Sequence, residues 1–375
     1  MKIVLIGPVY PYKGGISHYT GLLYKALVQN GHEVILHSFK FQYPKFLYKK
    51  EQKDERNQQF KIDTAKYSIH TANPVNWLGV ASQIKKCNPD LIILQWWHPY
   101  FAPCYWALGK FLGKQKLLFV CHNVFPHERF PMDRFLTKLV LKRGNYFITQ
   151  SQMDAEDLLS VKSKANYVVT PHPTYNAFKL QNMSMQEARD ILEIQDETKI
   201  LLFFGFVREY KGLKYLLEAM PEIVREIPNV QLWIVGDFGS DKEVYFRKIK
   251  ELDIQMQVKV VEGYIADADV EKYFTASDLV VLPYVSATQS GIVQIAYGFE
   301  KPVLVTNVGG LPDVVTDGKT GYVVDAESPR SIAKQVVDFF DNARMDEFVG
   351  HIKEEEEKFS WNTFVKQMEM LVQDM

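Results

Sequence analysis

Two cations stand between an apolar strand and a helix in the stretch FGFVREYKGLKYLLEAM, residues 204–220. Arg208 and Lys211 lie three positions apart, after Gly205 and before Gly212, which opens the helix. A guanidinium can bind two oxygens at once and an ammonium acts as a point charge, while a helix N-terminus already favours anions. These residues indicate a site for a doubly or triply negative group, and a solvated pair of loop cations is the alternative.

Two further loops carry glycines and amides next to expected helix starts. Gly14 and Gly15 end the loop GPVYPYKGG after the first apolar run, where bare backbone lets an anion approach. In PYVSATQSGIVQIAYGFEKPV, Ser290 is expected to cap a helix, and Gln289 and Gln294 suit sugar hydroxyls. The alternative for the two glycines is that they only form a turn. The alternative for the second loop is that Ser290 caps an ordinary helix without a ligand. Neither loop has the spacing of a dinucleotide fingerprint or a P-loop, which disfavours a simple dehydrogenase or P-loop enzyme.

Polar residues of the first half follow two apolar runs, in LQWWHPY and VCHNVFPHERF. His98 and His122 stand just past expected buried strands, with Asn123, His127 and Glu128 after the second. Two strand-end histidines favour a polar pocket, although a lone one is often a satisfied structural group. No carboxylate–histidine set has zinc-protease spacing, so we expect no bound metal.

The elements that must position these residues alternate regularly between strand and helix. Continuous rather than alternating apolar runs are typical of parallel strands covered on both faces. Helical patterns separate the runs, such as 17–29 with Gly31 as a stop, and the alternation predicts two doubly wound α/β domains. The runs are KIVLIG, HEVILHS, DLIILQWW, KLLFVCHN, NYFITQS and NYVVTPHP, then KILLFFG, VQLWIVGD, VKVVEGY, LVVLPY and KPVLVTNV.

We place an N-terminal domain at 1–175 and a C-terminal domain at 176–355. The tail 356–375 is expected to form an amphipathic helix that docks back on the first domain, through Trp361, Phe364, Met368 and Leu371. The double glycine in TNVGGLPDVV, residues 306–315, is expected to be architectural. Ligands of open parallel sheets bind beyond the carboxyl ends of the strands, so we expect the chemistry of this chain in its strand-end loops.

Composition restricts the class of partner. The 375 residues are 47% hydrophobic, and 44 Lys and Arg against 45 Asp and Glu give a formal charge of −1, which speaks against a nucleic-acid binder. Three cysteines without a CxxC pair fit a cytoplasmic setting, and the run in MKIVLIGPVYP is expected to be a strand, not a signal. The basic, aromatic stretches 41–50 and 132–144 could rest on anionic lipid at the inner face of a membrane. A solvated basic face explains them equally well.

The motifs in both halves together resemble those of glycosyltransferase family 4, the group 1 glycosyltransferases. They are GPVYPYKGGISHYTGLLYKAL, FFGFVREYKGLKYLLEAM, LWIVGD, YFTASDLVVLPY and KPVLVTNVGGLPDVVTDGKTGYVV. The resemblance implies a GT-B fold, with two Rossmann-like domains facing across a cleft and a C-terminal helix that crosses back to the first. It also implies a nucleotide-sugar donor held mainly by the second domain, transfer with retention, and no metal or other cofactor.

The resemblance assigns roles to individual residues. Arg208 and Lys211 match the phosphate-binding pair and are expected to be catalytic, together with His122, which falls near a histidine of the sugar site. His98 and Asn123 are expected on the acceptor side. The expected donor-binding residues include Gly15 at the diphosphate and Tyr264 and Ile265 at the nucleobase, and the full set is Gly14, Gly15, Gly205, Gly236, Tyr264, Ile265, Gln289, Ser290, Gly291 and Gln294.

One departure from the family concerns two glutamates that usually stand eight residues apart. The corresponding stretch is ATQSGIVQI, without an acid, although Gln294 could bind ribose hydroxyls without charge assistance. The sequence predicts a retaining transferase that moves a sugar to a glycan or lipid-linked acceptor in surface polysaccharide synthesis. The alternatives are a weak or inactive nucleotide-sugar-binding subunit and a GT-B-shaped sugar-nucleotide epimerase, which would need carboxylates at the site.

Overall fold

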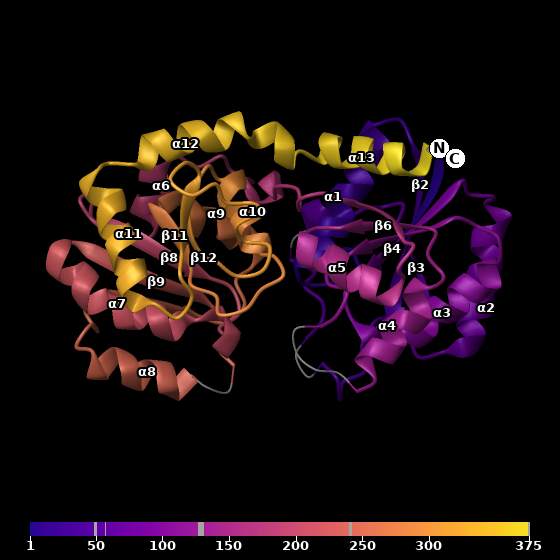
Figure 1. The fold of residues 1–375 in the computed structure, drawn as a ribbon, viewed down its shortest axis with the longest axis horizontal. Coiled ribbons are helices and arrows are strands. Elements are labelled where there is room, and N and C mark those ends of the chain that lie inside the picture. The colour runs from indigo at the N-terminus through magenta and orange to yellow at the C-terminus, as the bar shows by residue number, and fades with distance from the viewer. Residues whose placement is uncertain (49–50, 57, 127–130, 240–241, 374–375) are drawn as a thin grey trace. The chain divides into compact units, whose positions relative to one another are not determined.

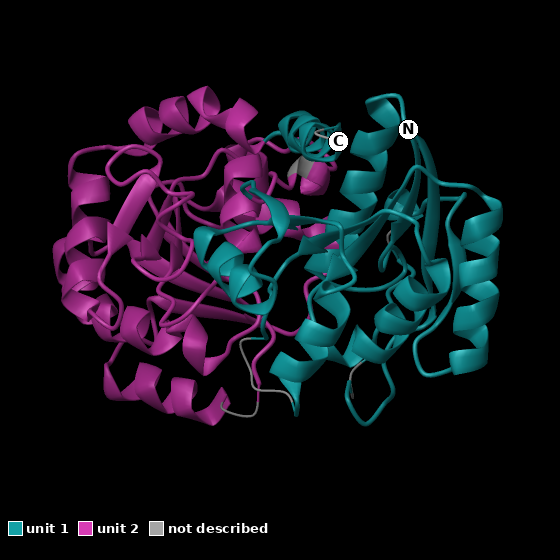
Figure 2. Ribbon diagram, turned by 45° about the vertical axis from the view of Figure 1, so that its right-hand side comes forward, with its two compact units in different colours: residues 1–171, 360–375 teal, residues 172–359 magenta. Residues whose placement is uncertain are grey.

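The chain divides into two compact units in a computed structural model that describes residues 1–48, 51–56, 58–126, 131–239 and 242–373 (Figure 1). Unit 1 comprises Met1–Pro171 and Ser360–Met375, and unit 2 comprises His172–Phe359 (Figure 2). The boundaries expected from the sequence, 175/176 and 355/356, stay predictions about domains. His127, Glu128 and the last two residues of the basic stretch 41–50 lie outside the described residues.

Unit 1 is built on a parallel sheet with the strand order β3-β2-β1-β4-β5-β6-β7. The order reverses between β1 and β4, which makes this the topological switch point of the sheet. The strands are β1 Lys2–Ile6, β2 Glu33–Phe41, β3 Lys66–His70, β4 Leu91–Trp96, β5 Leu117–Cys121, β6 Tyr146–Thr149 and β7 Asn166–Val169. The helices are α1 Gly15–Gln29, α2 Pro74–Lys86, α3 Ala102–Leu112, α4 Asp133–Leu141, α5 Gln152–Val161 and α13 Trp361–Gln373.

Helices cover the two faces of this sheet because each buries one apolar stripe. Buried residues of α2, α3 and α4 join alternate residues of the central strands in one core, which includes Trp96 and Phe147. The C-terminal helix α13 packs against α1 and β7 (Figure 1). Phe364 and Met368 of α13 are buried, and the Tyr19 ring of α1 lies 6.0 Å from that of Phe364.

Unit 2 repeats the plan with the parallel order β10-β9-β8-β11-β12-β13, which reverses between β8 and β11. One face packs on α7, α8 and α11. On the other, Phe204 of β8 contacts Phe274 of α9. The strands are β8 Lys199–Phe204, β9 Val230–Gly236, β10 Val258–Glu262, β11 Leu279–Leu282, β12 Val303–Thr306 and β13 Gly321–Val324. The helices are α6 Met185–Ile191, α7 Leu213–Glu226, α8 Lys242–Glu251, α9 Asp267–Ala276, α10 Gly291–Gly298, α11 Pro329–Asp341 and α12 Met345–Glu354.

The expectation of two doubly wound parallel sheets is confirmed, with two differences at the sheet edges. The strand β3 was not expected, since KYSIH is short, mixed in character and exposed at Tyr67. The strand β10 is not covered on both faces as expected, because it is an edge strand and Lys259 and Glu262 are exposed. In the described parts of the chain, no helix is long and apolar enough to cross a membrane.

Candidate functional site

The two cations of unit 2 lie at the topological switch point of its sheet. The loop after β8 carries Arg208 and Lys211, and the loop after β11, the strand paired with β8 across the reversal, leads into α10. All strands of the sheet run parallel, so the loops after β10, β9, β8, β11 and β12 share one edge. The expectation that the motifs stand at the carboxyl ends of strands is therefore confirmed in unit 2.

Bare backbone shapes this edge at two places. Gly236 ends β9 with φ 151°, and a Cβ built on it would lie 1.8 Å from the carbonyl oxygen of Gly205. Gly212 has φ 66°, and a Cβ there would lie 1.8 Å from the carbonyl oxygen of Pro283. Glycine allows both approaches, since a side chain would collide with backbone. These contacts hold the β8 loop against the β9 and β11 loops.

Arg208 lies at the exposed rim of this edge. The amide of the preceding residue, Val207, donates to the carbonyl of Asp237, which ties the β8 loop to the β9 loop. A Cβ built on Gly239 would lie 2.4 Å from Nη1 of Arg208, so the guanidinium rests over bare backbone. Its position leaves an exposed fork that can bind two oxygens of an anion.

Lys211 lies deeper, at the end of the short 3₁₀ helix η4 (Glu209–Lys211). Its Nζ stands 3.8 Å from the centroid of the Tyr284 ring, and the ring of Tyr210 is 5.5 Å away. Burial lowers the pKa of the Lys211 ammonium to about 8. Desolvation makes the charged form of Lys211 less favourable, and an anionic ligand beside the ammonium would stabilise that form again. Such a lysine is a candidate for a ligand-binding role.

Tyr284 was not singled out in the sequence, although it stands two residues past the apolar run LVVL. It is buried, and its hydroxyl lies 3.2 Å from Oγ of Ser290. Ser290 is the N-cap of α10 and accepts a hydrogen bond from the amide of Ile292, as expected. The signal that could have found Tyr284 is an aromatic residue at a strand end of a parallel sheet.

The amide residues expected at the donor hydroxyls flank the start of α10. Gln289 precedes the N-cap and is partly exposed, whereas Gln294 is only 1% exposed. The Oε1 atom of Gln294 has no hydrogen-bond partner among the described residues. A buried amide oxygen without a partner is costly, and a ligand hydroxyl that donates to it would remove the cost. Gly291 begins the helix beside the Tyr175 ring.

The residues expected at the nucleobase lie in the loop between β10 and α9. Tyr264 is 37% exposed, and Ile265 is partly buried. Their loop follows β10 at the same edge of the sheet as the cations, two strands away from β8. Their contact with a base stays a prediction.

In unit 1, the first glycine loop lies at the switch point after β1. Gly14 has φ 103° and stands as the N-cap of α1, which begins at Gly15, two residues before the expected start. Within the described residues, no side-chain hydrogen bond caps this helix. A helix N-terminus favours an anion, and the binding of an anion at Gly15 stays a prediction.

His122 follows β5 at the same edge of unit 1 and is only 3% exposed. Its Nε2 lies 2.6 Å from Oε1 of Gln95, a buried polar residue of β4 that the sequence did not single out. The Tyr19 ring meets the imidazole edge-on, with centroids 4.5 Å apart. The signal that could have found Gln95 is a single amide side chain within the apolar run DLIILQWW. The contact with Gln95 restrains the ring of His122.

His98 and Asn123 remain predicted acceptor-side residues. The Nδ1 atom of His98 accepts a hydrogen bond from the amide of Tyr100 and caps the 3₁₀ helix η2 (Pro99–Phe101). Burial lowers the pKa of His98. Asn123 is partly exposed beside His122. Within the described ranges, no group of three or more His, Cys, Asp and Glu side chains is placed to hold a metal ion.

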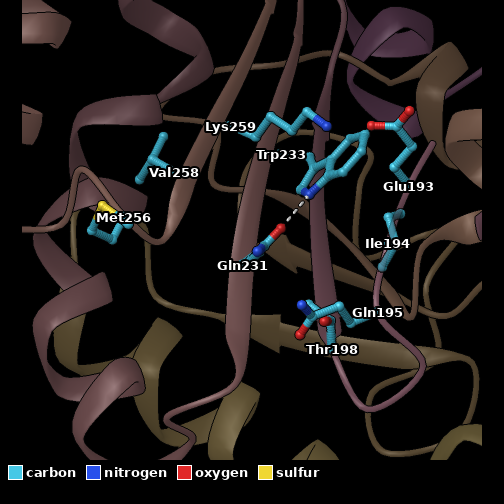
Figure 3. A pocket seen from close by; sticks show the side chains of 9 residues that line it. All are labelled: Glu193, Ile194, Gln195, Thr198, Gln231, Trp233, Met256, Val258 and Lys259. Carbon is cyan, nitrogen blue, oxygen red and sulfur yellow. Dashed lines mark hydrogen bonds between the residues drawn. The ribbon is translucent and has the colours of Figure 1, made fainter.

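A pocket of unit 2 lies away from these residues, at the amino ends of β9 and β10 (Figure 3). Lys259 extends over the Trp233 ring, with Nζ 4.2 Å from the centroid, and the indole donates to Gln231. Ligands of parallel sheets bind at the carboxyl ends, so the fold gives this pocket no role in the site above.

Two family models match consecutive parts of the chain. The model described as glycosyl transferases group 1 matches residues 184–358, and the model described as Glycosyltransferase Family 4 matches residues 13–174. The chain belongs to the group 1 glycosyltransferases of family 4. Membership confirms the resemblance drawn from the motifs, and the family's two models meet near the division between the two units.

Curated relatives of this chain align over part of their length. Spore coat protein SA of Bacillus subtilis (strain 168) is 29% identical over 173 residues, 44% of this chain and 45% of the relative. D-inositol 3-phosphate glycosyltransferase of Paenarthrobacter aurescens (strain TC1) is 25% identical over 47% of this chain and 44% of its own. The chain thus spans about half the length of the curated relatives that it matches.

Solved structures resemble this chain over its whole length. Sucrose-phosphate synthase from Thermosynechococcus elongatus is 18% identical with a TM-score of 0.74, covering 100% of this chain and 98% of that one. Anabaena Alr3699/HepE in complex with UDP-glucose is 17% identical with a TM-score of 0.75, covering both chains fully. These likenesses show the GT-B fold.

Proposed function

We propose that this chain transfers a sugar from a nucleoside-diphosphate donor to a glycan or lipid-linked acceptor, with retention of anomeric configuration. The observation that carries the proposal is the half-buried ammonium of Lys211 at the switch point of unit 2. Arg208 and the N-terminus of α10 stand at the same sheet edge. Family membership and a neighbour in complex with UDP-glucose support a sugar nucleotide as the ligand.

The proposed mechanism is electrostatic. Breaking the anomeric C–O bond makes the sugar oxocarbenium-like and builds negative charge on the β-phosphate. Groups that bind this charge more strongly in the transition state than in the ground state accelerate the step. We propose that Arg208 and Lys211 do this without a metal or other cofactor. The departing phosphate oxygen accepts the proton of the acceptor hydroxyl, so no enzymic nucleophile is needed.

Charge-removing variants test this mechanism. Arg208→Ala and Lys211→Ala are each expected to lower donor turnover by ~10²-fold or more, the scale of losing one transition-state donor. Lys214→Ala is the matched control, because Lys214 is an exposed cation in the first turn of α7. Turnover is measured as release of nucleoside diphosphate from UDP-, ADP- and GDP-sugars. Near-normal turnover by both variants would remove the pair from the mechanism.

A second candidate is a subunit that binds a sugar nucleotide but transfers slowly or not at all. The observation that favours it is the stretch ATQSGIVQI, which has no acid where the family usually has two glutamates. Binding of a sugar nucleotide by the wild-type chain, without donor hydrolysis or transfer to any offered glycan, would support this candidate over the transferase.

The acceptor and the cellular setting are also proposals. In α4, Phe135 is 58% exposed beside Arg134 and Lys138, a combination that suits an anionic bilayer surface. We propose a cytoplasmic protein that works on surface polysaccharide precursors at the inner face of the membrane. Flotation with anionic liposomes tests the membrane contact, and a lack of salt-sensitive binding would contradict it. The roles of Gly15 and His122 stay predictions.

A further inference from the structure

We infer that Tyr284 is a positioning residue for the phosphate-binding lysine: its ring fixes the ammonium of Lys211, and its hydroxyl links that lysine to the N-terminus of α10. The inference rests on the proposed function, because it concerns the group that binds the donor diphosphate. No family motif quoted above assigns a role to this tyrosine.

The ring contact is the first observation. Nζ of Lys211 lies 3.8 Å from the Tyr284 ring centroid, well within the range of a cation–π interaction, and Tyr284 is only 1% exposed. A desolvated contact of this kind is stronger than an exposed one. The ring therefore compensates part of the desolvation that lowers the pKa of Lys211. It also limits the rotamers of a side chain that is otherwise among the most flexible.

The backbone on both sides of the contact is held as well. Gly212 packs against the carbonyl of Pro283, and the amide of Val285 donates to the carbonyl of Tyr210 at 2.8 Å. The residues that flank Lys211 thus contact the residues that flank Tyr284. These contacts hold the two loops together across the switch point, with the ring of Tyr284 and the ammonium of Lys211 between them.

The hydroxyl of Tyr284 links these two loops to α10. It lies 3.2 Å from Oγ of Ser290, the side chain that caps the helix. The carbonyl of Tyr284 accepts a hydrogen bond from the hydroxyl of Thr306 in β12. An anion at Lys211 and the helix N-terminus would meet two groups whose spacing is already fixed, which lowers the entropy lost on binding.

A double-mutant cycle separates positioning from mere support of the fold. The variants are Tyr284→Leu, Tyr284→Phe, Lys211→Ala and the pair Lys211→Ala with Tyr284→Leu. The probe is UDP, with ADP and GDP in parallel, and dissociation constants are measured by calorimetry at pH 7. Tyr297→Leu is the matched control, because Tyr297 is a buried tyrosine of the same unit whose hydroxyl contacts Thr320 and for which no lysine contact is seen in the described structure.

We expect Tyr284→Leu to weaken nucleoside-diphosphate binding about tenfold, in the range of a desolvated cation–π contact. Tyr284→Phe keeps the ring and should stay within about threefold of the wild type. In the Lys211→Ala background, Tyr284→Leu should add less than about twofold, because the residue through which it acts is gone. Tyr297→Leu should leave the affinity unchanged, even where it lowers the thermal midpoint.

Two results would overturn the inference. Equal losses from Tyr284→Leu with and without Lys211 would show that the tyrosine supports the fold alone. If Tyr284→Leu left the affinity unchanged while Lys211→Ala caused a large loss, the proposed function would stand and only the positioning role of Tyr284 would be excluded. Failure of all three diphosphates to bind the wild type, or no effect of Lys211→Ala, would overturn the proposed function and the inference together.

Discussion

The two cations of the candidate site differ in burial. Arg208 is exposed, and its guanidinium can bind two oxygens of an anion. Lys211 is half-buried, and its ammonium has a pKa of about 8. The contribution of Lys211 to anion binding should therefore weaken as the pH rises above about 8.

Nucleoside-diphosphate affinity should fall as the pH rises above about 8. Below this pH, Lys211 is charged in the free protein; above it, binding must first protonate the lysine, because a bound anion raises its pKa. The loss approaches tenfold per pH unit until the pKa of the complex is reached. The titratable groups seen to contact Lys211 are Tyr210 and Tyr284. Calorimetry with UDP from pH 7 to 9.5 measures the slope.

Lys211→Arg provides the control for this titration. Arginine keeps its charge across the range, so the variant should bind UDP with a nearly constant affinity, even if its absolute affinity is lower. A wild-type affinity that stays flat to pH 9.5 would mean that Lys211 keeps an ordinary pKa or does not meet the phosphates.

At the level of elements, the sheet order explains why residues far apart in the sequence share one edge. The sequence was sufficient to place Arg208, Lys211 and Ser290 at strand ends, because apolar runs and glycines mark where each strand stops. It could not show that Tyr284 lies under Lys211, since that contact depends on β8 pairing with β11 and on the tilt of two loops. The edge strand β3 could not be predicted, because its five residues, KYSIH, are mixed in polarity and do not form a continuous apolar run.

The helix α9 also anchors a loop of unit 2 that precedes α6. Glu271 is 1% exposed, and its carboxylate accepts hydrogen bonds from the amides of Leu180, Gln181 and Met183 at 2.7, 2.7 and 2.9 Å. Hydrogen bonds to a charged acceptor are the stronger kind. Glu271 thus fixes a loop whose own sequence has no regular pattern.

Glu271→Ala should lower the free energy of unfolding of unit 2 by about 2–4 kcal/mol, because it leaves three backbone amides without their acceptor. Asp269→Ala, on the same helix, removes only the half-exposed pair with Lys272 and should cost less than about 1 kcal/mol. Urea unfolding of both variants, monitored by the amide exchange of residues 180–183, measures these two losses of free energy. Equal effects of the two variants would contradict the anchoring role.

At the level of the whole molecule, unit 1 is assembled from both ends of the chain. Its sheet comes from the first 171 residues, yet α13 comes from residues beyond the end of unit 2. Tyr19 of α1 contacts both Trp361 and Phe364, and Glu369 lies 2.9 Å from His32. Of the four tail residues expected on the apolar face, Phe364, Met368 and Leu371 are buried and Trp361 is partly buried. The stability of unit 1 thus depends on residues at the far end of the sequence.

Phe364→Ala should therefore destabilise unit 1 and leave unit 2 unchanged. Truncating a fully buried phenylalanine costs about 3–5 kcal/mol through lost apolar contacts and the cavity left behind. Hydrogen exchange with mass spectrometry reads the two units separately, and protection should fall in the peptides of α1 and β7 but not in those of β8 and α7. Met370→Ala is the control on the same helix, because Met370 is 59% exposed and should change protection little. Equal loss of protection in unit 2, or an equal effect of Met370→Ala, would show that the helix does not stabilise unit 1 through its buried face.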